Sequence, residues 1–193
     1  MKIGLMGGSF DPVHFGHLVA AQDAMEQYRL DRLVLIPAAQ APMKAHHVHA
    51  TGHARVAMVK SAVDWDSRFE VSDFEVKRGG VSYTVDTATY FRTVFPDDEL
   101  YWIMGGDQVS KLGQWKDIEI LAGLVEFIYL ERPGHAAREA PLVPSLKLRR
   151  CNGHLIEISS TELRQRLHLG FSLDYFVPHN AIEYIQQHRL YRT

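Results

Sequence analysis

The sequence contains a single cysteine, Cys151, among its 193 residues. One thiol cannot form an internal disulfide, which favours a reducing compartment, and we expect the cytoplasm. No apolar run approaches the length that spans a membrane. The apolar start, Lys2–Met6, is too short to be the core of a signal peptide. We therefore expect no membrane partner.

The sequence also lacks an excess of charge of either sign. Lys and Arg total 21 and Asp and Glu total 23, which gives a formal net charge of −2. A protein that follows a long phosphate backbone needs a basic surface, so we expect no nucleic-acid partner. A small phosphate ligand is not excluded, because a few local groups can hold it.

Internal repeats and low-complexity segments are absent as well. Hydrophobic residues make up 46% of the chain and charged residues 23%, which is ordinary globular composition and argues against disorder. The length predicts one domain over residues 1–193, with a C-terminal helical part from about residue 159 packed on it. The sequence does not reveal an oligomeric state, and a homo-oligomer is compatible with it.

Short apolar runs alternate with amphipathic stretches along the chain. The expected strands are Lys2–Met6, Leu33–Ile36, Phe69–Val71, Phe74–Val76, Leu100–Met104, Val125–Leu130 and Leu155–Ile158. The first expected helix carries Leu18 to Tyr28, and the last covers about Asn180 to His188. Three further helices are expected to begin after the cap residues Thr51, Thr84 and Ser159. Alternation of strand and helix predicts an α/β fold, a doubly wound parallel sheet with helices on both faces. Ligands of such folds bind beyond the carboxyl ends of the strands.

The loop after the first strand has the features of a phosphate site. It begins Gly7-Gly8-Ser9-Phe10 and continues to His14 and His17, which lie three apart at the start of a helix. Glycines let a ligand approach the backbone, and a helix N-terminus offers free N–H groups to an anion. Imidazoles there can stabilise charge that develops on a phosphoryl group. A helix start with two incidental histidines is the alternative interpretation.

A second such loop follows the expected last strand. Ser159, Ser160 and Thr161 place three hydroxyls at a helix start, and Arg164 lies one turn later. Hydroxyls, N–H groups and a guanidinium together could hold a polyphosphate. Ser159 with Glu162 also forms a capping box, which explains these residues without any ligand.

The two motifs together resemble the nucleotidyltransferase superfamily, and nearly the whole chain is similar to the bacterial nicotinate-nucleotide adenylyltransferases. The resemblance rests on the order and spacing of several segments. These are Gly7 to Leu18 with its His14-x-Gly16-His17, Ser82 to Thr87, Gly105-Gly106-Asp107 with Trp115, Arg132-Pro133-Gly134, Ile158 to Arg164, and the ending through Tyr191.

The resemblance implies a Rossmann-like fold and the transfer of an adenylyl group from ATP to nicotinate mononucleotide, with ATP accompanied by Mg²⁺. The mononucleotide phosphate would attack the α-phosphate directly, without a covalent enzyme intermediate. This agrees with the two loops, neither of which presents an obvious nucleophile beside a base. Positioning and charge stabilisation would then carry the catalysis.

The resemblance also implies roles for individual residues. His14, His17 and Arg164 would be catalytic. The ATP-binding residues would be Gly7, Gly8, Ser9, Phe10, Asp107, Ser159, Ser160 and Thr161. The residues binding nicotinate mononucleotide would be Lys44, Tyr83, Thr84 and Trp115, with the indole stacked on the nicotinate ring. Without the resemblance, Trp115 is equally well explained as a half-buried core residue and Thr84 as a helix cap.

Three positions depart from the family pattern. Met43 stands where the family usually has histidine, so no histidine contact is transferred there. Ser9 replaces a common threonine and keeps the hydroxyl, and Lys116 follows Trp115 where an aromatic residue is common.

Four histidines, His46, His47, His49 and His53, gather around a predicted loop and helix start. No cysteine accompanies them, so we interpret them as an exposed segment and expect no protein-bound metal centre. Alternative functions are a sister transferase that uses nicotinamide mononucleotide or phosphopantetheine, and a nucleotide-binding sensor without catalysis. An aminoacyl-tRNA synthetase fragment is disfavoured by the chain length and by the missing Lys-Met-Ser-Lys-Ser segment.

Overall fold

The computed structural model describes residues 1–42, 49–131, 141, 143–154 and 156–191. Its centre is a six-stranded sheet with the order β3-β2-β1-β4-β5-β6, in which every neighbouring pair is parallel. The strands are β1 (Lys2–Gly8), β2 (Arg32–Pro37), β3 (Phe69–Val71), β4 (Glu99–Gly105), β5 (Glu126–Leu130) and β6 (Leu148–Cys151). This doubly wound order confirms the expected Rossmann-like α/β fold.

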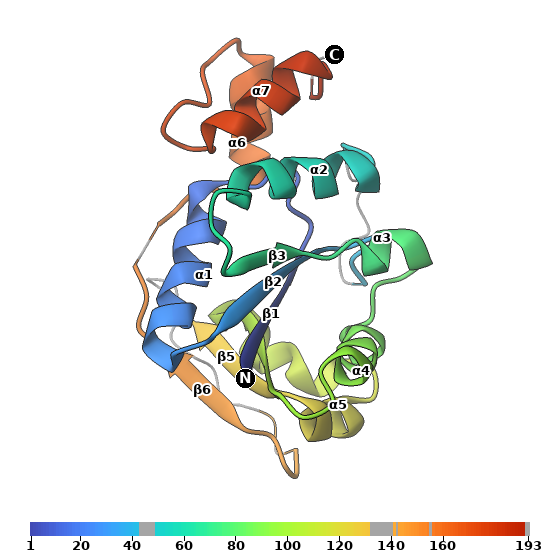
Figure 1. Ribbon diagram of the computed structural model, residues 1–193. Helices are drawn as coiled ribbons and strands as arrows, with labels where there is room; N and C mark the ends of the chain where they lie inside the picture. Colours follow the sequence, from blue (N-terminus) through green and yellow to red (C-terminus); the bar gives the residue numbers. More distant parts are fainter. Residues whose placement is uncertain (43–48, 132–140, 142, 155, 192–193) are drawn as a thin grey trace.

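Helices connect the strands and follow the last one. They are α1 (Phe15–Tyr28), α2 (Gly52–Val63), α3 (Phe74–Arg78), α4 (Thr84–Val94), the 3₁₀ helix η1 (Gly106–Gln114), α5 (Ile118–Leu124), α6 (Ser160–His168) and α7 (His179–Gln187). Figure 1 shows α1 and α2 on one side of the sheet, α4 and α5 on the other, and α6 and α7 beyond α2.

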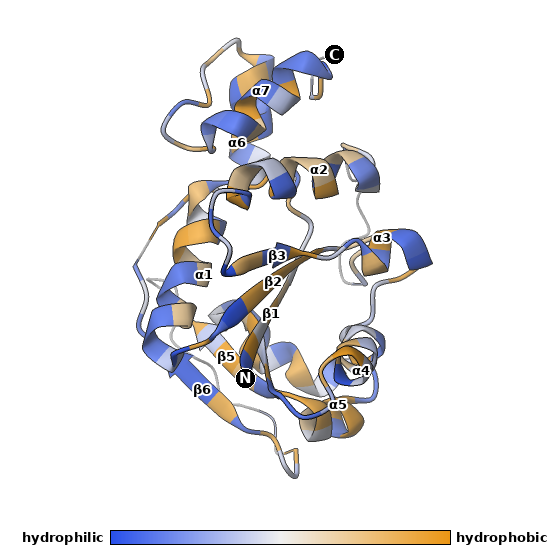
Figure 2. Cartoon of the chain, in the orientation of Figure 1, coloured by the Kyte–Doolittle hydropathy of each residue, from blue (hydrophilic) through white to orange (hydrophobic). Residues whose placement is uncertain are grey.

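Two apolar clusters hold this arrangement together, one on each face of the sheet. The first joins sheet residues to the helices on the α1 side and includes Leu163, Leu173 and Ile185 from the C-terminal part. The second joins the other face to α4, η1 and α5. Figure 2 shows the central strands as the most hydrophobic part of the ribbon, as expected when both faces of a parallel sheet are covered. Within the described residues no helix is long and apolar enough to cross a membrane.

Two expected strands are wrong. Phe74–Val76 begins the helix α3 because Ser72 Oγ accepts from the Phe74 amide and turns the chain out of β3, after which the Lys77 amide bonds to the Asp73 carbonyl. The last strand is Leu148–Cys151, and 156–158 lie outside any strand, while residue 155 is outside the described part. Arg149 and Arg150 at the centre of this edge strand interrupt its apolar pattern, so the sequence pattern did not indicate a strand here. Arg149 pairs with Glu126 of β5.

The helix boundaries in the structure differ less from the predicted ones than the strands do. Thr51 caps α2 as expected, since its Oγ1 accepts from the Ala54 amide at 3.2 Å. Thr84 was expected as a cap and is instead the first residue of α4, with Tyr83 as the N-cap. Ser159 caps α6 by accepting from the Glu162 amide.

Candidate active site

The candidate site lies where the order of the strands reverses, between β1 and β4. Connections leave these two neighbouring strands in opposite directions along the sheet, which opens a crevice at their carboxyl ends. A cavity of about 360 Å³ lies there, lined by strand ends, the start of α1 and the segment before α6. Its lining residues are Met6, His14, Gly16, His17, Ala20, Met104, Gly105, Leu130, Glu131, His154, Ile156, Glu157, Ile158, Ser159 and Glu162.

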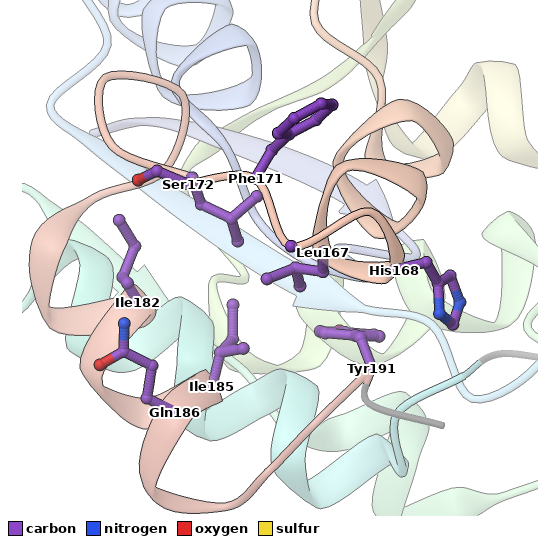
Figure 3. Close-up of a pocket in the computed structure, with 10 residues that line it drawn as sticks. Leu167, His168, Phe171, Ser172, Ile182, Ile185, Gln186 and Tyr191 are labelled. Carbon is purple, nitrogen blue, oxygen red and sulfur yellow. The ribbon is translucent and has the colours of Figure 1, made fainter.

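A larger cavity of about 530 Å³ lies between α6, the α6–α7 connection and α7 (Figure 3). Leu167, Ile182 and Ile185 form much of its wall, and Tyr191 closes one side. None of the residues predicted to act on a substrate lines it. The smaller cavity is the better candidate because it contains both histidines of the first loop and lies at the topological switch point.

The two histidines form a stacked pair at the start of α1. Their ring centroids are 3.6 Å apart and their planes differ by 24°. His14 is the N-cap and is buried, while His17 is half-buried. The His14 amide donates to Nδ1 of His17 at 3.3 Å. A neutral His17 therefore carries its proton on Nε2, which makes that atom a hydrogen-bond donor.

The electrostatics of this helix start favour an anion. The first turn of α1 contains no acidic residue, so no carboxylate in that turn offsets the positive end of the helix dipole. Glu131 on the cavity wall is paired with Arg150. A polyphosphate at the N-terminus of α1 would meet backbone N–H groups and imidazoles.

Glycines allow the side chains of the loop to pack this closely. A Cβ on Gly8 would lie 2.9 Å from the ring of Phe10, and one on Gly16 would lie 3.0 Å from Nδ1 of His14. Phe10 has φ of 47°, a left-handed conformation that a bulky residue rarely adopts. Its buried ring meets His17 edge-on, with centroids 5.0 Å apart.

The structure brings the second predicted phosphate motif against the first. Ser160 Oγ donates to the Pro12 carbonyl at 2.9 Å. Arg164 Nη1 donates to the Asp11 carbonyl at 2.7 Å, and its Nη2 donates to Thr161 Oγ1 at 3.2 Å. These two bonds use two of the five guanidinium N–H groups. The N-terminus of α6 thus lies beside the loop that follows β1.

The other predicted ATP residues occupy the same edge of the sheet. Gly7 and Gly8 end β1, and Ser9 follows them with its carbonyl bound by Arg55. Asp107 is exposed in the first turn of η1, directly after β4. The Asp107 carboxylate folds back over Gly105, where an added Cβ would lie 2.5 Å from Oδ1, and accepts from Gln108 at 2.6 Å.

The predicted acceptor residues form a separate group on the α4 and η1 side of the sheet. Tyr83 and Trp115 are half-buried and pack against the second apolar cluster. Lys116 joins them, since its Nζ lies 4.7 Å from the centroid of the Tyr83 ring and 3.4 Å from Asp86. Thr84 follows Tyr83 at the start of α4 and is half-buried.

A buried acid supports this acceptor group. Glu75 is 3% exposed, and burial raises the pKa of its carboxyl although the hydroxyls of Ser82 and Thr87 act in the opposite direction. Thr87 donates to it at 2.6 Å. Ser82 in turn accepts from the Ala39 amide at 3.0 Å, which ties this segment to the loop after β2.

Some predicted residues lie outside the described part of the chain. These are Lys44, Met43, His46, His47 and the Arg132-Pro133-Gly134 segment. Of the four clustered histidines, His49 and His53 are described and both are exposed. Among the described residues, no group of three or more acidic, histidine or cysteine side chains could hold a metal ion.

Sequence reasoning missed several residues at the site. His154 lines the cavity and is held by Asp23 of α1, with Nδ1 and Oδ1 2.8 Å apart. Glu131 and Glu157 also line it. No local pattern could reveal the contact between His154 and Asp23, because these two residues are 131 positions apart in the sequence. The buried Asp11 lies within the Gly7 to Leu18 segment, but its partners are distant in the sequence.

Comparisons with known proteins agree with this geometry. Residues 5–166 match the family described as cytidylyltransferase-like. The chain is 62% identical over 192 residues to a probable nicotinate-nucleotide adenylyltransferase of Opitutus terrae, covering 100% of this chain and 98% of the relative. It is 45% identical over 194 residues to one from Thermus thermophilus, covering 100% of both chains.

A solved structure supports the fold. The nicotinic acid mononucleotide adenylyltransferase of Plasmodium falciparum, complexed with NaAD, superposes with a TM-score of 0.78. The two chains are 22% identical, with 98% of this chain and 97% of the other covered. The fold, the site at the switch point and the full-length relatives agree, and the chain belongs to the nicotinate-nucleotide adenylyltransferase family.

Proposed function

We propose that this chain transfers the adenylyl group of ATP to nicotinate mononucleotide, giving deamido-NAD and pyrophosphate, a step of NAD biosynthesis. The observation that carries the proposal is the stacked pair of His14 and His17 at the N-terminus of α1, beside the N-terminus of α6. Two helix starts, two imidazoles and one guanidinium meet at one point of the sheet edge. This arrangement suits a polyphosphate.

In this function the phosphate groups of ATP lie along the two helix starts. His14 and His17 stabilise the charge of the departing pyrophosphate, and Arg164 holds the triphosphate with Ser159, Ser160 and Thr161. Gly7, Gly8, Ser9 and Phe10 let the nucleotide approach the end of β1. The acceptor phosphate attacks the α-phosphate in line, so the protein supplies orientation and charge stabilisation rather than a nucleophile.

The acceptor is held by the group on the α4 side. The flat face of Trp115 suits the nicotinate ring, and Tyr83 and Thr84 at the start of α4 suit its carboxylate through the helix N-terminus. Lys44 is assigned to the mononucleotide phosphate from the sequence alone.

Nucleotidyltransferases typically use a divalent metal with ATP. We infer that the metal here is Mg²⁺. Its preferred ligands are oxygens from one or two carboxylates, phosphates and water. The exposed carboxylate of Asp107 beyond β4 fits this donor set, and the phosphates of ATP would supply further ligands. When bound, Mg²⁺ neutralises phosphate charge, and the protein keeps the nucleotide oriented.

We also propose that residues 1–193 form one nucleotidyltransferase domain that acts in the cytoplasm. The support for a single domain is that α6 and α7 contribute Leu163, Ile182 and Ile185 to the same apolar cluster as the sheet. Cys151 is free and buried, which agrees with a reducing compartment. Self-association stays a prediction.

The experiment is to measure pyrophosphate release from ATP and Mg²⁺ with each acceptor in turn. We expect turnover with nicotinate mononucleotide to exceed turnover with nicotinamide mononucleotide and phosphopantetheine. A preference for either of the other acceptors would contradict the proposal. Binding of ATP without turnover on any acceptor would instead indicate a nucleotide sensor.

A further inference from the structure

The carboxylate of Asp11 lies at the meeting point of three segments that are distant in the sequence. Asp11 is 4% exposed, within the loop that follows β1. Its Oδ1 accepts from the hydroxyl of Tyr191 at 2.7 Å and from the Ala50 amide at 3.1 Å. Its Oδ2 accepts from the His49 amide at 2.7 Å. Three donors satisfy a buried carboxylate that would otherwise be costly to desolvate.

Tyr191 reaches this carboxylate from the C-terminal helical part. Its ring points toward Leu167 and Ile185, which hold it between α6 and α7 (Figure 3). Burial raises the pKa of the Tyr191 hydroxyl, and the neighbouring Asp11 carboxylate adds to this effect. The phenol therefore remains a proton donor toward Asp11 throughout the physiological pH range.

A buried arginine holds the same loop from the other side. Arg55 of α2 is 1% exposed, and its Nη1 donates to the Ser9 carbonyl at 2.7 Å. Its Nε donates to the Ala50 carbonyl at 3.2 Å. Burial lowers the pKa of Arg55, while the carboxylate of Asp11 raises it and so favours the charged form. The two opposite charges stabilise each other in the interior.

These contacts surround a strained residue. Phe10 has φ of 47°, and such a conformation in a bulky residue persists only where the surroundings enforce it. The residues on both sides of Phe10 are held through their carbonyls, Ser9 by Arg55 and Asp11 by Arg164. The Phe10 ring in turn meets His17. The position of His17 therefore depends on the contacts that hold the loop.

We propose that Asp11, Tyr191 and Arg55 are positioning residues for adenylyl transfer, and we call them the Asp11 latch. The latch fixes the backbone of residues 9–12 so that Phe10 and the start of α1 present the two histidines to the phosphates. The proposal rests on the proposed function. None of the three residues needs to touch a substrate, since each acts through the loop.

The test compares Tyr191→Phe with Tyr184→Phe. Tyr191→Phe removes only the hydroxyl that binds Asp11 and keeps the ring between α6 and α7. Tyr184 is a half-buried tyrosine of α7 whose ring stacks on His188, and it serves as the matched control. We expect kcat of Tyr191→Phe to fall about tenfold, since small displacements of catalytic groups are costly. The KM for nicotinate mononucleotide and the Tm should stay close to the control.

A second variant, Asp11→Asn, places an amide before three hydrogen-bond donors and should lower kcat further. The double variant Asp11→Asn with Tyr191→Phe should be no slower than Asp11→Asn alone, because the two residues act through one contact. Should Asp11→Asn fail to fold, Tyr191→Phe decides alone. An unchanged kcat in folded Tyr191→Phe would overturn the proposal. So would a fall in Tm with unchanged kcat per folded molecule, which marks a purely structural role.

Binding of a non-hydrolysable ATP analogue separates this proposal from the proposed function. Absence of turnover with nicotinate mononucleotide in the unsubstituted protein would refute the function but leave the latch testable. Calorimetry should then show weaker analogue binding by Tyr191→Phe than by Tyr184→Phe, several-fold in Kd. Equal affinities of the two variants would overturn the latch.

Discussion

The rings of His14 and His17 stack with their centroids 3.6 Å apart at the N-terminus of α1. Positive charge on both rings at this distance is unfavourable until an anion lies against them. The polyphosphate that we propose for this site would provide such an anion, and the roles proposed for its residues can be tested separately.

Replacement of His17 by alanine should lower kcat by about 10²–10³, as loss of one preorganised donor does in other enzymes. The Tm should change little, because His17 is only half-buried. Steady-state kinetics on the folded variant measures the effect. His53→Ala, at an exposed position of α2, is the control. Wild-type kcat in His17→Ala would exclude the assigned role.

Replacement of Trp115 by alanine should act on the acceptor and leave ATP unaffected. We expect the KM for nicotinate mononucleotide to rise about tenfold, within the range of aromatic stacking energies. The KM for ATP should stay near its original value. Trp65 is 79% exposed in the turn that follows α2, and Trp65→Ala is the control. Equal acceptor KM values for the two variants would count against stacking.

Replacement of Gly8 by alanine should disturb the loop directly. The new Cβ would lie 2.9 Å from the buried Phe10 ring, so the ring or the loop must shift at a cost of about 1–3 kcal/mol. Gly123→Ala in α5 meets no atom within 4 Å and should be neutral or stabilising. The two variants are compared by their free energies of unfolding in urea and by their kcat values. A Gly8→Ala variant as stable and active as Gly123→Ala would show that the packing is not tight.

Glu75 should make stability depend on pH in a defined direction. Burial raises the pKa of its carboxyl above the ordinary 4.5, so the folded state binds its proton more tightly than the unfolded chain. Its contribution to stability is complete below 4.5 and is lost as the pH rises through the raised value. Glu75→Gln should remove this pH dependence of stability. The free energy of unfolding that depends on pH amounts to about 1.4 kcal/mol for each unit by which the pKa is raised.

The measurement is urea unfolding of wild type and Glu75→Gln between pH 4.5 and 8. The stability of the wild type should fall relative to the variant as the pH rises. Glu119→Gln, at an exposed position of α5, should run parallel to the wild type. Parallel curves for all three proteins would refute the assignment.

Cys151 should react slowly in the folded protein. Its side chain is buried and its Sγ donates to Gln27 at 3.5 Å, and burial raises the pKa of the thiol to about 11. Thiolate is therefore scarce at pH 8. A thiol reagent followed by mass spectrometry should label the protein fully in denaturant and only marginally without it. Rapid labelling under native conditions would contradict the packing around β6.

The sequence predicted the strand and helix starts at this edge of the sheet well because their signals are local. Strand, glycines and helix start follow one another between residues 2 and 18, and the capped helix after Ser159 repeats the pattern. The expected strand at Leu155–Ile158 was wrong because it was predicted from a local pattern alone. Which segment pairs with β5 depends instead on contacts between segments that are distant in the sequence. Leu148–Cys151 forms the strand, and Arg149 bonds to Glu126 across the pair.

Long-range contacts set the limit of prediction at the site. Asp11 was visible in the motif, but nothing near it in the sequence indicates Tyr191 or the amides of His49 and Ala50. Likewise, the pairing of Lys116 with Tyr83 joins segments on different elements. Such contacts follow from the order of the strands in the sheet, which the periodicity of hydrophobic residues along the sequence cannot specify.

The bond between Tyr191 and Asp11 joins residues 180 positions apart. During synthesis the loop after β1 leaves the ribosome long before its C-terminal partner exists. Every strand of the sheet precedes α6 in the chain, so the sheet can pair while the loop still lacks its last support. The strands can thus pair before Tyr191 is made, whereas the loop after β1 reaches its final geometry only once the C-terminal helices pack on the sheet side that carries α1.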